Sequence, residues 1–203
     1  MRANISLSLN LMNFKKRILV APLNWGLGHA TRCIPIIRGL IHQGFEPIIA
    51  SDGEALELLT KEFPEIIACE LPSYGITYSK KAKSLKWKLL SKSPQIMNAV
   101  KKEKRTTTEL IKEYNIRGII SDNRFGVRDR NIPSVFMTHQ IQVLSGSSTW
   151  ISTRINQNLI KKFNECWVPD NSSLPNLSGD LGHPKSSKLK PKYIGPLSRF
   201  QNI

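Results

Sequence analysis

The chain alternates between short apolar runs and longer segments whose apolar positions recur every three or four residues. The apolar runs are short enough to be strands and occupy residues 18–21, 47–50, 65–70, 118–121, 134–138 and 165–168. Helical spacing lies between them at residues 30–43, 54–62 and 149–163, and it also leads up to residue 114. Strands that alternate with helices in this way predict an α/β fold, with a doubly wound, mainly parallel, Rossmann-like sheet.

The turn after the first predicted strand carries the residues that most suggest a binding site: Asn24, Trp25, Gly26, Gly28 and His29. Glycines at this position let the backbone turn tightly and let a ligand approach backbone N–H groups. A dinucleotide-binding fingerprint would need a third glycine where threonine stands, and it would follow its strand directly. The two glycines could also serve the turn alone. We predict that the turn and its neighbours bind a substrate.

Polar residues also follow the fourth and fifth predicted strands, with Asp122 and Arg124 after one and His139 and Gln140 after the other. The carboxyl ends of parallel strands meet at one edge of a sheet, and ligands bind there. We therefore expect all four residues to contribute to substrate binding. Asp122 and Arg124 would orient a hydroxylated or phosphorylated substrate, or they would pair with each other and cap a loop. An imidazole exchanges protons near neutral pH, which makes His29 the candidate catalytic base.

Composition adds an expectation about partners. The formal net charge of +15 favours an anionic partner, either an anionic membrane surface, a phosphorylated substrate or nucleic acid. Much of this charge lies at residues 75–105, where lysines alternate with apolar residues, as in an interfacial helix. No apolar run approaches the roughly 18 residues that a membrane-spanning helix needs. The three cysteines are widely spaced, which favours reduced thiols in a cytoplasmic protein, and we expect neither a metal site nor a cofactor.

Three segments together resemble the amino-terminal half of GT-B-fold glycosyltransferases: residues 22–32, 121–126 and 193–200. The resemblance is strongest to family 28, which includes the transferase that adds N-acetylglucosamine to a lipid-linked peptidoglycan precursor. It implies two Rossmann-like domains that face each other across a cleft, one holding the acceptor and the other most of a nucleotide-sugar donor. It also implies direct sugar transfer without a metal, with His29 as the base.

This resemblance predicts how the chain is organised. Residues 1–13 are expected to be a disordered extension, and residues 14–168 an acceptor-side domain. Residues 169–203, rich in proline, serine and asparagine, are expected to be a hinge towards a missing carboxyl-terminal donor domain. The polypeptide alone would then be catalytically incomplete, and a separate subunit could supply the donor half. The alternatives are half of a sugar-nucleotide epimerase and a non-enzymatic basic module for anionic membrane or nucleic acid.

Overall fold

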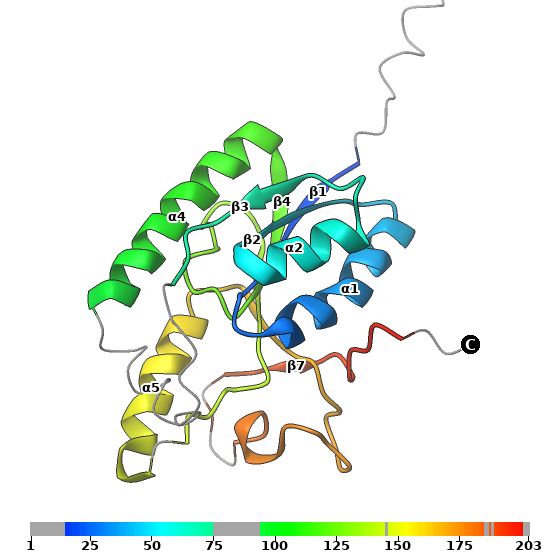
Figure 1. Cartoon of the computed structure of the whole chain (residues 1–203). Coiled ribbons are helices and arrows are strands. Elements are labelled where there is room, and N and C mark those ends of the chain that lie inside the picture. The colour runs from blue at the N-terminus through cyan, green and yellow to red at the C-terminus, as the bar shows by residue number, and fades with distance from the viewer. Residues whose placement is uncertain (1–14, 75–93, 145, 185–186, 188, 201–203) are drawn as a thin grey trace, which may run out of the picture.

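The structure, a computed structural model, describes residues 15–74, 94–144, 146–184, 187 and 189–200 (Figure 1). The elements in chain order are β1 (Arg17–Pro22), α1 (Leu27–His42), β2 (Glu46–Ser51), α2 (Gly53–Glu62), β3 (Ala68–Glu70), α4 (Pro94–Tyr114), β4 (Ile116–Asp122), β5 (Ser134–Met137), η2 (Gly146–Ser148), α5 (Thr149–Ile160), β6 (Glu165–Val168), η3 (Gly179–Leu181) and β7 (Lys192–Tyr193). The expected disordered extension, residues 1–13, lies outside the described residues.

The strands of the described ranges form one seven-stranded sheet in the order β3-β2-β1-β4-β5-β6-β7. Every neighbouring pair is parallel, which confirms the predicted α/β fold. Element bounds shift by a few residues, and two strands differ more from the prediction. Strand β3 covers three residues rather than residues 65–70. Strand β7 pairs Lys192 and Tyr193 with β6, so part of the expected hinge is an edge strand of the sheet.

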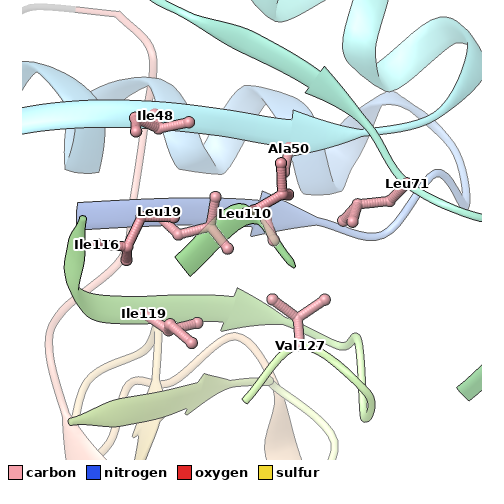
Figure 2. Close-up of a cluster of buried hydrophobic side chains, with 9 residues drawn as sticks. Leu19, Ile48, Ala50, Leu71, Leu110, Ile116, Ile119 and Val127 are labelled. Carbon is pink, nitrogen blue, oxygen red and sulfur yellow. The ribbon is translucent and has the colours of Figure 1, made fainter. Parts of the chain in front are cut away.

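The two faces of the sheet explain why its central strands are continuously apolar. In β1, Leu19 and Ala21 belong to a core cluster with Leu110 of α4 (Figure 2). Val20, between them in sequence, belongs to a second cluster with Ile34 of α1 and residues of α2. Successive strand residues point to opposite faces, so α4 covers one face while α1 and α2 cover the other (Figure 1).

A third apolar cluster supports the β5–β6 side of the sheet. Phe136 of β5 lies between Phe125, whose ring stacks on it at a centroid distance of 5.0 Å, and Phe163, whose ring is tilted at 4.9 Å. Ile160 at the end of α5 packs into the same cluster. Helix α4 begins at Pro94, so the lysine-rich segment is helical from there, whereas residues 75–93 lie outside the described residues. Among the helices of the described ranges, none combines the length and apolar character of a bilayer-spanning segment.

Candidate active site

The turn between β1 and α1 brings His29 to the carboxyl edge of the sheet. Gly26 precedes α1 with a φ of 83°, a conformation that favours glycine. Helix α1 then begins at Leu27, so His29 lies in its first turn and its side chain is 12% exposed. Gly28 lies inside the helix, and a Cβ added there would meet no atom within 4 Å. Space is therefore open beside Gly28, the residue before the histidine.

A buried carboxylate lies beneath this histidine. Asp122 ends β4, the neighbour of β1 in the sheet, and its side chain is fully buried. Its Oδ1 lies 3.1 Å from His29 Nδ1. Arg32, one turn after His29 on α1, donates from Nε to Asp122 Oδ2 at 2.6 Å and from Nη2 to Oδ1. Burial opposes ionisation, but the charge of Arg32, and after it that of His29 when its ring is protonated, outweigh burial and lower the pKa of Asp122 to about 2.

His139 joins the same network from the neighbouring strand. It follows β5, and its Nδ1 lies 2.8 Å from Arg32 Nη1. A guanidinium only donates, so His139 Nδ1 is the acceptor and its Nε2 carries the ring proton. Burial, and after it the charge of Arg32 and that of a protonated His29, lower the pKa of His139 to about 4. The structure thus brings together His29, Asp122 and His139 as the sequence led us to expect.

The depressed pKa of His139 predicts a specific loss of stability in mild acid. A histidine in the unfolded chain has a pKa near 6.5, whereas the pKa of His139 in the folded protein is about 4. The stabilisation is therefore complete above about pH 6.5 and is lost as the pH falls towards 4, by at most about 1.4 kcal/mol per pH unit. Denaturant unfolding at several pH values measures it. His139→Gln should flatten the profile in this window, and identical profiles for both proteins would contradict the prediction.

Arg124 lies in the protein core rather than at the expected binding surface. Its side chain is fully buried and forms ion pairs with Asp52, before α2, and with Glu103 of α4, the latter at 2.8 Å. Its Nε also donates to the carbonyl oxygen of Pro22 at 2.9 Å. Asp122 bonds to residues of α1 instead, so the structure does not pair it with Arg124. The arginine joins the end of β1 and the loops after β2 and β4 to α4.

Other predicted binding residues have structural contacts of their own. Asn24 Oδ1 accepts from the backbone N–H of Ala55 at 3.3 Å, which caps the first turn of α2. Gly53 has a φ of 50°, and a Cβ there would lie against the Asn24 amide. Trp25 is partly buried in the turn before α1. Gln140 is also partly buried, and its backbone N–H donates to Thr138 Oγ1 at 3.0 Å.

A pocket of about 240 Å³ adjoins the histidine cluster. Arg32 and His139 line it on one side, and Leu177 and Leu197 contribute apolar walls. Asp170, after β6, also lines it and accepts hydrogen bonds from four donors, the backbone N–H groups of Asn171, Leu177 and Ser178 and the Ser178 hydroxyl. Burial opposes its charge, but the bonds from Ser178, Leu177 and Asn171 outweigh burial and lower the pKa of Asp170.

Sequence reasoning missed two residues of this site, Arg32 and Asp170. Arg32 stands three positions after His29, which places both side chains on one face of α1, and this spacing was a usable signal. Asp170 lies in the proline-rich segment, where the strand pattern had ended, so nothing local marked it. Among the described residues, His, Cys, Asp and Glu side chains form no group of three that could hold a metal ion.

Known solved structures share this fold. No protein-family model matches the chain, and a search of curated proteins gave no match. Among solved structures, it is similar to UGT2 of Phytolacca americana, complexed with UDP-2-fluoro-glucose and pterostilbene, at 13% identity and a TM-score of 0.58, over 90% of this chain and 54% of that one. The spinosyn rhamnosyltransferase SpnG, complexed with thymidine diphosphate, matches at 12% identity and a TM-score of 0.56, over 86% of this chain and 49% of that one.

MurG of Acinetobacter baumannii matches at 12% identity and a TM-score of 0.50, over 79% of this chain and 43% of that one. The chain thus spans about half the length of these solved structures. These neighbours are GT-B glycosyltransferases, so the seven-stranded parallel domain has the fold of one half of that architecture.

Proposed function

We propose that this chain is the acceptor-binding half of a glycosyltransferase that moves a sugar from a nucleotide-sugar donor to an acceptor hydroxyl. The observation that carries the proposal is the contact between His29 and the buried Asp122 at the carboxyl edge of β1 and β4. When Nδ1–H of His29 donates to this carboxylate, Nε2 is free to take a proton, which is the arrangement a general base requires. Gly28, the residue before this base, has open space beside it.

The proposed reaction is a direct displacement. The acceptor oxygen attacks the anomeric carbon of the donor sugar while His29 Nε2 takes the hydroxyl proton. A bond forms between the acceptor oxygen and the anomeric carbon, and the bond from that carbon to the diphosphate oxygen breaks. Its electron pair leaves with the nucleoside diphosphate. Asp122 holds the His29 ring and stabilises the imidazolium that forms.

The donor would be bound mainly by a second domain, because the chain spans about half of the transferases that it resembles in fold. A sugar or a lipid-linked molecule, as in family 28 enzymes, is the proposed acceptor. The basic α4 supports a location on the cytoplasmic face of an anionic membrane, since its exposed side chains include Lys101, Lys102, Lys104 and Arg105. The remainder of the lysine-rich segment lies outside the described residues.

Sugar transfer with His29→Ala tests the proposal directly. The chain is combined with a donor-binding half supplied as a separate polypeptide, and transfer of labelled sugar from nucleotide-sugar donors to hydroxyl acceptors is measured. We expect His29→Ala to lower the rate by about 10²–10⁴-fold, because general-base catalysis contributes this much. His42→Ala is the matched control, since His42 is exposed at the other end of the same helix.

Two outcomes would count against the proposal. Unchanged transfer by His29→Ala would remove His29 from the mechanism. Isomerised donor sugar formed without any acceptor would indicate the epimerase alternative instead of a transferase.

A further inference from the structure

The closest contact of the His29 ring is with an arginine rather than with the carboxylate. Arg32 Nη2 lies 2.6 Å from His29 Nδ1, whereas Asp122 Oδ1 lies 3.1 Å from the same nitrogen. A guanidinium nitrogen always carries its protons and only donates. The short Arg32 contact therefore requires His29 Nδ1 to accept, and the proton of the neutral ring then resides on Nε2. In that tautomer Nε2 has no lone pair with which to accept a proton.

The same guanidinium also determines the tautomer of His139. Arg32 Nη1 lies 2.8 Å from His139 Nδ1, which again places the ring proton on Nε2. Asp122 holds Arg32 in this position through Nε and Nη2. One arginine, anchored by one buried carboxylate, thus points an N–H group at the Nδ1 atoms of both histidines.

Two arrangements of the His29 ring exclude each other at this site. When Arg32 donates to Nδ1, Nε2–H is a hydrogen-bond donor. When Nδ1–H donates to Asp122, Nε2 is a base, but an Arg32 N–H would then face another N–H. The bond from Arg32 Nε to Asp122 Oδ2 does not involve the histidine, so the guanidinium can leave Nδ1 without leaving the carboxylate. The Arg32 side chain is 13% exposed and lines the neighbouring pocket, so the guanidinium has open space into which it can turn.

We propose that Arg32 is a positioning residue that sets the tautomer of His29. In the chain without substrate, it holds the Nε2–H form, and its withdrawal from Nδ1 produces the form that accepts a proton at Nε2. The catalytic meaning of this switch rests on the proposed function, whereas the tautomer itself does not. His139, held by the same guanidinium, presents a neutral Nε2–H donor.

Nitrogen NMR of the ring atoms tests the proposal on the chain as it is. The protein is labelled with ¹⁵N-histidine, and long-range ¹H–¹⁵N correlations at pH 7.5 show which nitrogen of each ring carries the proton. His29→Gln and His139→Gln assign the signals. In the wild-type chain we expect Nε2–H at both His29 and His139. His29 with a protonated Nδ1 in the wild-type chain would overturn the proposal, and this measurement needs no change at Arg32.

Arg32→Met should then move the His29 proton to Nδ1, where it donates to Asp122. Arg38→Met is the matched control, because Arg38 lies on the same helix but pairs with Glu62. It should leave both tautomers unchanged. His29 that keeps Nε2–H in a folded Arg32→Met protein would overturn the proposal, and Arg32→Gln serves the same comparison if the methionine variant does not fold.

Neither donor nor acceptor is present in these measurements. A tautomer that does not respond to Arg32 therefore rejects the positioning role alone, and sugar transfer that does not depend on His29 rejects the proposed function alone.

Discussion

Replacing Arg124 by methionine is expected to lower the free energy of unfolding by about 3–5 kcal/mol. The guanidinium is fully buried and forms ion pairs with two carboxylates, Asp52 and Glu103, of which Glu103 is fully buried as well. Removing one member of a buried ion network leaves charges that water cannot reach. Methionine fills similar volume, so the loss reports the charges rather than a cavity. Chemical denaturation monitored by circular dichroism measures the effect.

The matched control for this prediction is Arg105→Met. Arg105 also pairs with a carboxylate, that of Glu109, but its side chain is 85% exposed. Exposed ion pairs contribute little, so we expect a change within about 0.5 kcal/mol. A change within about 0.5 kcal/mol for Arg124→Met as well would show that the buried network does not stabilise the fold. A folded Arg124→Met protein of normal stability that fails to bind substrate would instead support the binding role expected from the sequence.

The carboxyl group of Glu103 in the same network predicts how the stability of Arg124→Met depends on pH. Burial already raises the pKa of Glu103, while Arg124 and the hydrogen bonds from Tyr74 and Gly126 oppose that rise. Without the guanidinium, the pKa of Glu103 should rise further and the carboxyl should take up a proton. The stability deficit of Arg124→Met should therefore shrink as the pH falls.

Asp122→Asn is expected to lower sugar transfer by about 10⁴-fold, the cost of the same replacement beside the histidine of a Ser-His-Asp site. An amide oxygen is a weaker acceptor than a carboxylate, and the amide carries no charge to stabilise the imidazolium. It also loses the ion pair with Arg32, which loosens the positions of both histidines. The assay is the reconstituted sugar transfer used for His29→Ala.

Asp180→Asn is the control for this variant, because Asp180 is an exposed carboxylate on η3 outside the histidine cluster. Its transfer rate should equal that of the wild-type chain. Unfolding curves of Asp122→Asn identify a temperature at which the variant is folded, and the rates are compared there. A folded Asp122→Asn protein with unchanged transfer would mean that the carboxylate does not assist His29.

Local sequence was sufficient to predict most of the strands and helices and the edge at which the site lies. Apolar runs such as residues 118–121 predicted buried parallel strands, because both faces of such a strand are covered by helices. Since the carboxyl ends of parallel strands share one edge, the positions of His29, Asp122 and His139 could be inferred from the strands that precede them. These three residues do meet in the structure.

The pairing of charged side chains could not be read in the same way. Arg124 stands two residues after Asp122, and proximity in sequence suggested a role in the same site. In the fold it bonds instead to Asp52, 72 residues away, and to Glu103, 21 residues away. Successive residues after a strand leave in different directions, so the backbone path decides which loop each side chain meets.

The sequence by itself thus determined the α/β architecture, the glycine-bearing turn and the edge where His29 lies, because periodicity and turn residues are local properties. Only the tertiary structure decided that Arg32 lies between two histidines and one carboxylate, and that residues 192–193 extend the sheet. Those outcomes depend on contacts between residues far apart in the sequence, such as Arg32 and Asp122, which are 90 positions apart. Such contacts are set by how strands are ordered and how helices pack on them, and no short segment encodes either.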